Sequence, residues 1–341
     1  MTQTENTPAR RPAFSELPLR KGDPSYSAWG FWGLDDQLGT LNLITPSVVK
    51  NASSEIKEGL RFSLKYGDTG CWSLSEPKTP GFRRHEFAYE HSIVGPGNVL
   101  DDTDPQLNFN TQKSTQWDGL RHFAYQKEGL FYNGITKDDM LKSQEGSLGI
   151  HNWHTKGGIT TRGFLIDYWA YAELVGQKYD PSTPHAIQYD DIVSCLEWQH
   201  GQSPGGLEPQ PGDILIIRSG FTARYVNLSA EEEKNGGEAW PPASCGLQQD
   251  RRLLQWLWDK KFAGVGGDAP GWEAFPIAEE AGFTFHEVLL SGWGCPIAEL
   301  LYLEDLAAWC RENKRWTFFL SSCPLNVHGG VASPANMIAL V

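Results

Sequence analysis

The sequence predicts a fold of mixed helices and strands, α/β or α+β, in a single domain. Short apolar segments typical of strands are interspersed with segments of helical spacing, without the strict alternation of a parallel βαβ fold. The chain has 341 residues, 40% of them hydrophobic and 21% charged, an ordinary globular composition that can bury a sizeable core. We expect residues 26–341 to form this domain. Residues 1–25 are polar and rich in proline, and we expect them to form an arm that is either flexible or draped over the surface.

The first expected element is a helix that begins after Thr45 and ends at Gly59. Thr45 is a good N-cap, and Pro46 suits the first helical position. Strands are expected where short apolar or alternating segments lie next to turn residues. These segments are residues 60–66, 163–168, 213–218, 263–267, 316–320 and 336–341.

Two later helices are expected. The clearer one covers residues 247–260, where four large apolar residues recur at helical spacing. The other covers residues 303–312 and begins with acidic residues, which suit the positive end of a helix dipole. Residues 202–212 and 231–242 are rich in turn-forming and charged residues, so we expect surface loops there.

Composition excludes several classes of function. The net charge of −13 would repel nucleic acid, and no long basic run offsets it. No segment approaches the roughly 18 apolar residues of a membrane span, and the first residues lack the apolar core of a signal peptide. The six cysteines form no C-x-x-C pair and are expected to be reduced thiols. We therefore expect a cytoplasmic protein that acts on a small molecule, without nucleic-acid or membrane partners.

The run from residue 112 to residue 122 carries the most chemical information. It holds a carboxylate and an imidazole four residues apart, Asp118 and His122, and two glutamines upstream with the same spacing, Gln112 and Gln116. Asp and His are ligands for Zn²⁺ or Mn²⁺, and His is the usual general base near neutral pH. A hydrogen-bonded structural pair would explain Asp118 and His122 equally well.

This run resembles the signature of the cyclase / kynurenine formamidase-like metal hydrolases. That signature has His, any residue, Gly, Thr, His, any residue, Asp, any residue, Pro, any residue and His in succession. Asp118 and His122 match its Asp and its last His, and Thr115 matches its Thr. Gln112 and Gln116 stand where the signature has its two leading histidines. The resemblance is greatest to the longer, fungal-type cyclase-like members, whose signature is similar to S-x-Q-W-D-G-L-R-H.

Two further residues extend the resemblance. His286, shortly before a Leu-Leu pair, and Glu299, before the last expected helix, are similar to family positions that are metal ligands. The resemblance spans about residues 29–340. It implies a swivelling β/β/α fold, usually assembled as a homodimer or a larger homo-oligomer. It also implies hydrolysis of amides or lactam-like rings by a metal-activated water, with the last signature His as acid and base.

The two glutamines bear on the metal that the resemblance implies. An amide oxygen is neutral and a weak ligand for Zn²⁺. Asp118, His286 and Glu299 would still suit one Zn²⁺ or Mn²⁺ ion, with Gln116 as a poor fourth ligand. The alternative is that the metal has been lost and that the same three strong ligands form a proton-transfer network with His122.

Several residues near the matched motifs are candidate substrate contacts. Gln112 and Gln116 can donate and accept hydrogen bonds, and Trp117 offers an aromatic surface. Asp268 follows a glycine-rich turn where the family has an active-site Asp turn, although a structural turn explains it equally well. His328 is not part of the family pattern and is either a substrate contact or a loop residue.

The leading functional interpretation is a hydrolase that uses one divalent metal ion. It would open an amide, lactam or lactone bond of a small cyclic or aromatic substrate, with His122, Asp118 and Glu299 as catalytic residues. The alternative is a metal-independent cyclase or lyase. It would dehydrate, isomerise or close a ring by acid/base catalysis on a secondary-metabolite intermediate. A non-catalytic small-molecule binder is a third interpretation, which the presence of both His122 and Glu299 disfavours.

Overall fold

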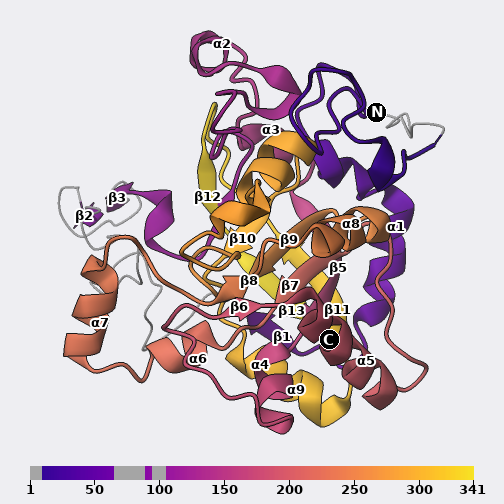
Figure 1. Ribbon diagram of the computed structural model, residues 1–341, viewed down its shortest axis with the longest axis vertical. Coiled ribbons are helices and arrows are strands. Elements are labelled where there is room, and N and C mark those ends of the chain that lie inside the picture. Colours follow the sequence, from indigo (N-terminus) through magenta and orange to yellow (C-terminus); the bar gives the residue numbers. More distant parts are fainter. Residues whose placement is uncertain (1–9, 65–88, 94–104) are drawn as a thin grey trace.

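A mixed nine-stranded sheet forms the centre of the molecule (Figure 1). This computed structural model describes residues 10–64, 89–93 and 105–341. In spatial order the strands are β1 (Arg61–Ser63), β13 (Met337–Leu340), β11 (Thr317–Ser322), β5 (Ile159–Ile166), β7 (Ile214–Ile217), β9 (Gly264–Gly267), β10 (Ile297–Glu299), β4 (Gln116–Asp118) and β12 (Ala332–Pro334). Two small sheets pair β2 (Tyr89–Ile93) with β3 (Pro105–Phe109) and β6 (Ala186–Ile187) with β8 (Gly246–Leu247).

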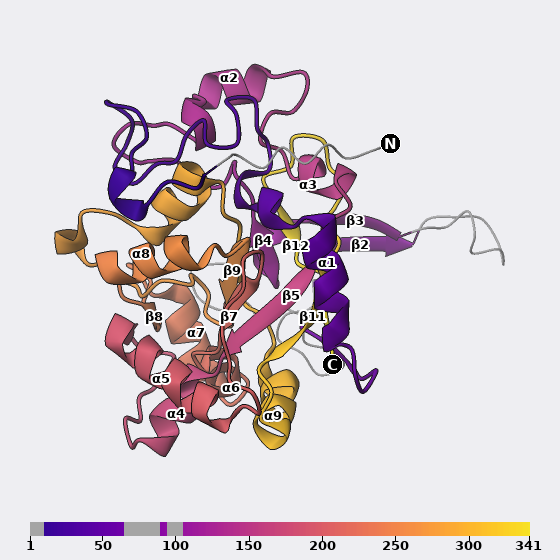
Figure 2. The ribbon, with the colours of Figure 1, turned by 90° about the vertical axis from the view of Figure 1, so that its right-hand side faces the viewer.

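The middle of the sheet is parallel and both of its ends are antiparallel. Strands β5, β7, β9 and β10 run parallel, and the strands outside them pair antiparallel. Every residue of β7 and β9 is buried, as expected for parallel strands covered on both faces. Figure 2 shows the helices that cover the two faces of the sheet, with α1 on one side and α5 and α8 on the other. The mixed architecture agrees with the sequence prediction.

The helices surround this sheet. They are α1 (Pro46–Ala52), α2 (Lys137–Lys142), α3 (His151–Thr155), α4 (Tyr168–Leu174), α5 (Tyr189–Gln202), α6 (Phe221–Tyr225), α7 (Ala230–Glu238), α8 (Arg251–Lys260), α9 (Glu304–Asn313) and the π-helix η8 (Glu287–Trp293). Short 3₁₀ turns are η1 (Phe14–Glu16), η2 (Gly39–Leu43), η3 (Ser53–Glu55), η5 (Thr111–Lys113), η6 (Tyr132–Gly134) and η7 (Glu279–Ala281). Helix α8 has the predicted apolar face, since Leu253, Leu254, Leu257 and Trp258 are all buried.

Most predicted elements are present, with shifted ends. The Thr45 hydroxyl caps α1 by accepting from the Val48 amide at 3.3 Å, but the helix ends at Ala52 and continues only as the 3₁₀ turn η3. The predicted loop at 231–242 is wrong, because α7 occupies most of it. Ser229 and Glu232 form a capping box that starts this helix. Helix α5 was not predicted, since only Ile192, Cys195 and Gln199 of its residues are buried.

Residues 10–25 pack against the domain, as the surface-draped alternative of the expected arm requires, and are not flexible. Phe14 is 3% exposed, and the Trp258 indole of α8 donates to the Pro12 carbonyl oxygen at 2.9 Å. The Arg11 guanidinium lies 3.7 Å from the centre of the Trp258 ring, a cation–π contact. Polar composition alone did not reveal these anchors. Residues 1–9, the rest of the expected arm, lie outside the described residues.

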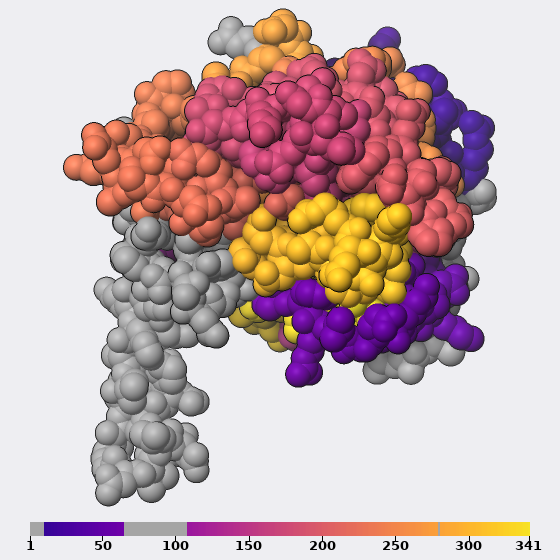
Figure 3. Space-filling model, turned by 90° about the horizontal axis from the view of Figure 1, so that it is seen from below, coloured from indigo at the N-terminus to yellow at the C-terminus, as the bar shows by residue number. Residues whose placement is uncertain are grey.

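The last strand of the chain, β13, lies next to β1 at one edge of the sheet. β1 pairs with β13 in register from Arg61 opposite Leu340 to Ser63 opposite Ile338. Seen from below, residues near the end of the chain (yellow) adjoin the violet segment that ends in β1 (Figure 3). No helix among the described residues is both long and apolar enough to cross a membrane.

Candidate functional site

The site is built on the pairing of β4 with β10. Gln116 lies directly opposite Glu299, and Asp118 lies opposite Ile297. Because side chains alternate along a strand, Gln116, Asp118 and Glu299 share one face of the sheet and Trp117 points to the other. The Thr115 hydroxyl donates to the Leu300 carbonyl oxygen at 2.8 Å and fastens the two strands just beyond this pairing.

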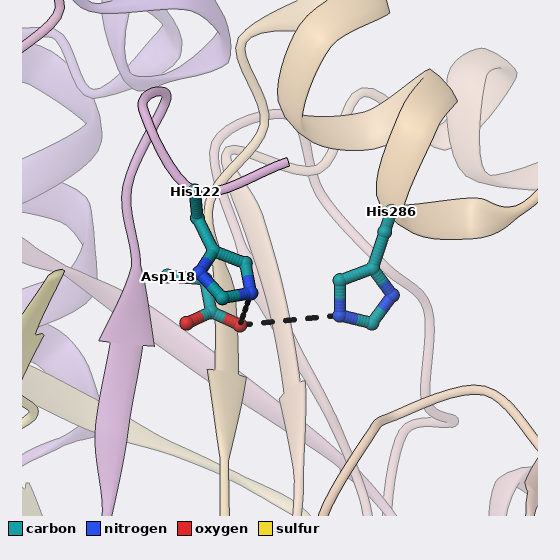
Figure 4. Close-up of side chains that lie close together, drawn as sticks. All are labelled: Asp118, His122 and His286. Carbon is teal, nitrogen blue, oxygen red and sulfur yellow. Dashed lines mark ion pairs between the residues drawn. The ribbon is translucent and has the colours of Figure 1, made fainter. Parts of the chain in front are cut away.

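Asp118 is fully buried at the centre of the site. Its Oδ1 accepts from the Gln112 side-chain amide at 2.9 Å. Its Oδ2 lies 3.7 Å from His122 Nε2 and 3.9 Å from His286 Nε2, too far for a hydrogen bond to either ring (Figure 4). The ligand atoms of Asp118, His122 and His286 all lie within 4.8 Å of one another.

His122 lies on a tight turn after β4. The turn approaches the backbone at Val331 closely, because the Gly119 amide donates to the Val331 carbonyl oxygen at 3.1 Å and a Cβ on Gly119 would lie 2.4 Å from that oxygen. The Arg121 guanidinium donates to three carbonyl oxygens of neighbouring segments, those of Ser147, Gly329 and Met140. The turn is therefore rigid. The His122 side chain is 25% exposed, and no hydrogen bond to another described residue holds its ring.

His286 is held much more firmly than His122. It precedes the π-helix η8, and its Nδ1 lies 2.6 Å from Glu273 Oε1. Its Nε2 faces Glu299 Oε1 at 3.3 Å and Asp118 Oδ2 at 3.9 Å. π-helical turns occur frequently at functional sites. Glu273, which the sequence did not reveal, thus belongs to the site through His286.

The two glutamines act as donors to the carboxylates. Gln116 Nε2 donates to Glu299 Oε2 and to Gln112 Oε1, both at 2.8 Å. Gln112 in turn donates to Asp118 Oδ1. The opposite orientation of the Gln116 amide would place its oxygen against a carboxylate oxygen, so this network fixes the amide. Gln116 therefore presents N–H groups to Glu299 and Gln112, and its Oε1 is buried without a hydrogen-bond partner in the described structure.

Charge is concentrated at this site. Burial raises the pKa of Asp118, and the nearby Glu299 adds to this rise, whereas His122 and His286 oppose it. Burial lowers the pKa of His286, but hydrogen bonds and charge from Glu273 and Glu299 outweigh burial and leave this pKa well above its usual value. The buried carboxylates therefore make the site strongly attractive to a positive charge.

The group fits a divalent cation. Because His286 Nδ1 lies against Glu273, loss of the other ring proton would leave an Nε2 lone pair that faces the oxygens of Asp118 and Glu299. Lone pairs that face one another need a proton or a cation between them. Asp118 Oδ2 is buried without a hydrogen-bond partner in the described structure, and carboxylate with imidazole is a donor set that Zn²⁺ or Mn²⁺ accepts.

A cavity of about 250 Å³ opens beside these residues. Its lining combines the polar residues Gln112, His122, Glu273, His286 and Glu299 with Phe123, Pro270, Gly271, Phe275 and Ile277. The volume is below the roughly 300–1,000 Å³ typical of pockets for drug-sized ligands, so a small ligand suits it best. Sequence reasoning did not identify Phe275 and Ile277, because they belong to no motif.

The backbone is strained at two places next to this cavity. Trp272, between Gly271 and Glu273, has φ of 45°, and Leu300, directly after Glu299, has φ of 55°. Such left-handed conformations cost bulky residues on the order of 1 kcal/mol or more and persist where surrounding structure enforces them. Both bends adjoin residues that carry carboxylates of the site.

Three predicted substrate contacts lie elsewhere. Trp117 is fully buried, and its indole donates to Ser322 Oγ at 2.9 Å, so it is a core residue. Asp268 is also fully buried, and its Oδ1 accepts from the Ser219 amide and hydroxyl at 2.7 and 2.8 Å. His328 is exposed and lies over His151 with ring centres 4.7 Å apart. None of the three lines the cavity.

The family follows from comparison with known proteins. The family model described as "Putative cyclase" matches residues 63–274, more than half of the chain. The chain belongs to this cyclase family. A solved structure of a "novel cyclase" is 28% identical to this cyclase-family chain, with a TM-score of 0.75, and the match covers 92% of this chain and 99% of the other. Membership supports an enzymatic activity and confirms the fold that the motif resemblance implied.

Two more distant structures share the fold. Isatin hydrolase A from Labrenzia aggregata, bound to benzyl benzoate, is 15% identical with a TM-score of 0.53, and the match covers 85% of the cyclase-family chain and 95% of the hydrolase. Isatin hydrolase A from Ralstonia solanacearum is 16% identical with a TM-score of 0.51, covering 87% and 98%. No curated protein matches the chain.

Proposed function

We propose that this protein is a hydrolase that uses one divalent metal ion to open an amide, lactam or lactone bond of a small cyclic or aromatic substrate. His286 Nε2 faces the carboxylates of Asp118 and Glu299, with His122 beside them at a small cavity, and this arrangement carries the proposal. Isatin is a cyclic amide fused to an aromatic ring, and proteins with this fold are named for its hydrolysis. A flat aromatic amide of that kind suits an apolar wall that includes Phe123 and Phe275.

The residues divide into ligands and a proton carrier. Histidines that bind metals nearly always donate their other ring N–H to a carboxylate or a carbonyl, as His286 does to Glu273. We therefore assign Asp118, His286 and Glu299 as ligands. Zn²⁺ or Mn²⁺ held there would polarise a substrate carbonyl and acidify water. His122 is partly exposed at the cavity and not restrained by a described hydrogen bond, so it is suited to move a proton at Nε2.

One observation favours a second candidate, a metal-independent cyclase or lyase. Gln112 and Gln116 present amide donors where the family signature has histidines, and they hold Asp118 Oδ1 and Glu299 Oε2 in hydrogen bonds. With a proton in place of the cation, the same carboxylates and imidazoles could catalyse a ring closure or an elimination.

Chelation separates the two candidates. The purified protein should be assayed with isatin, an aromatic formamide and an aromatic lactone, before and after treatment with a chelator. We expect ring opening or deformylation that is lost on chelation and restored by Zn²⁺ or Mn²⁺. Turnover that persists in the metal-free protein would contradict the metal-assisted proposal and favour the second candidate.

A further inference from the structure

We propose that Glu273 is a positioning residue that fixes the ring of His286 with Nδ1 protonated and Nε2 turned to the cavity. The inference rests on the proposed function only in treating His286 Nε2 as a metal ligand. Neither the sequence motifs nor the family match assigns a role to Glu273. Its role follows from its contacts, from the backbone that carries it and from its position behind His286.

The carboxylate of Glu273 is saturated with donors from the protein. Oε1 accepts from the His286 amide at 3.0 Å and lies 2.6 Å from His286 Nδ1. Oε2 accepts from the Phe285 amide at 2.9 Å and from Gln249 Nε2 at 2.6 Å. An ionised carboxylate has about four acceptor sites and no donor, so His286 Nδ1 must supply the proton of their contact. Nε2 is then the ring nitrogen left for a ligand.

These four contacts also distinguish Glu273 from a catalytic residue. Glu273 is fully buried, although it lies at the cavity wall. All of its acceptor sites are directed at the protein, whereas His122 presents its ring to the cavity. Glu273 therefore acts on a bound molecule only through His286.

The backbone before Glu273 is held in a strained conformation. Trp272, the preceding residue, is held in the left-handed region at φ 45°. The segment is fastened to Leu247, whose amide donates to the Trp272 carbonyl oxygen at 3.0 Å and whose carbonyl oxygen accepts from Ala274 at 2.9 Å. A Cβ on Gly246 would lie 2.3 Å from the Glu273 carbonyl carbon, so this approach requires glycine there. Strain enforced at a functional position in this way supports a positioning role.

The test compares Glu273→Gln with Glu287→Gln. Glu287, the residue after His286, is a matched control, since its carboxylate also accepts two backbone amides, those of Gln126 and Thr284, and not the His286 ring. Zn²⁺ affinity would be measured by competition with a chromophoric chelator. We expect about a 10- to 100-fold loss for Glu273→Gln and less than about a twofold change for Glu287→Gln. Equal affinities in the two variants would overturn the inference.

A spectroscopic measurement on the wild-type protein keeps the inference testable if Glu273→Gln does not fold. A short Nδ1–H contact to a carboxylate should give a strongly downfield imidazole N–H proton in NMR spectra, absent in His286→Gln and present in Glu287→Gln. Absence of this signal from wild type would overturn the inference. Wild type that shows the signal but binds no Zn²⁺ would contradict the proposed function and leave the positioning role supported.

Discussion

Gln116 and Glu299 lie directly opposite one another on β4 and β10, and the Gln116 amide donates to Glu299 Oε2 at 2.8 Å. The signature that residues 112–122 resemble has a histidine at the position of Gln116, so a neutral amide stands where that signature has an imidazole. Each carboxylate therefore accepts from a glutamine amide and also faces an imidazole. Asp118 accepts from Gln112 and faces His122, whereas Glu299 accepts from Gln116 and faces His286.

Replacing Gln116 with histidine should therefore strengthen metal binding. The imidazole would add a strong ligand beside both carboxylates, and we expect Zn²⁺ affinity to rise by at least about tenfold. Chelator competition measures the change, and Gln202→His, at an exposed position in α5, is the control. If Gln116→His binds no more metal than this control, position 116 does not face the ion.

Replacing His122 with alanine should abolish turnover without removing the metal. Loss of a general acid–base lowers rates by about 10²- to 10⁴-fold, while the three assigned ligands remain. His328→Ala is the control, since His328 lies outside the cavity and should leave turnover within about twofold of wild type. Near-normal turnover in His122→Ala would remove this residue from the mechanism. Loss of the ion together with activity would make it a ligand.

Gly119→Ala should destabilise the protein. The added methyl would lie 2.4 Å from the Val331 carbonyl oxygen, and overpacking of this kind costs about 1–3 kcal/mol. Gly201→Ala in α5 is the matched control, because its methyl meets nothing within 4 Å and alanine favours a helix by about 0.5–1 kcal/mol. Urea unfolding measures both variants. Equal stability of Gly119→Ala and wild type would show that the turn can relax.

Asp268→Asn should remove one component of the pH dependence of stability. Burial raises the pKa of Asp268 from its usual 3.8 to about 6, so the folded state binds the proton more tightly than the unfolded state. The contribution of this residue to stability therefore falls as pH rises from about 4 to about 6, by about 3 kcal/mol. In the Asp268→Asn variant, stability should depend less on pH in that interval. Its Tm at pH 7 should rise, and its turnover should not change. An unaltered stability profile would contradict the raised pKa.

The regular parts of the fold could be predicted because their patterns are local. The apolar runs of β5 and β7, the short glycine-rich segment of β9 and the helical spacing of α8 identify those elements from a few neighbouring residues. Strands β4 and β10 have three residues each, too few for a periodic pattern, and they exist because they pair across a long stretch of sequence. The site could therefore be located only through the motif resemblance.

Errors in the predicted site have the same origin. Trp117 was expected to face the substrate, but period-two alternation within β4 turns it away from Asp118 and into the core. Glu273 belongs to no motif, and only the tertiary contact between its segment and the start of η8 brings it to His286. The π-helix itself gives no local sequence signal of this kind.

The most direct test of the central claim is elemental analysis of the protein purified without added metal, beside Asp118→Ala. Asp268→Asn is the control, because it replaces a buried carboxylate that lies outside the cavity. We predict about one Zn or Mn ion per chain in wild type and Asp268→Asn, and none in Asp118→Ala. Absence of metal from wild type, even after incubation with Zn²⁺ and Mn²⁺, would contradict the account and leave acid/base cyclisation or elimination as the chemistry of this site.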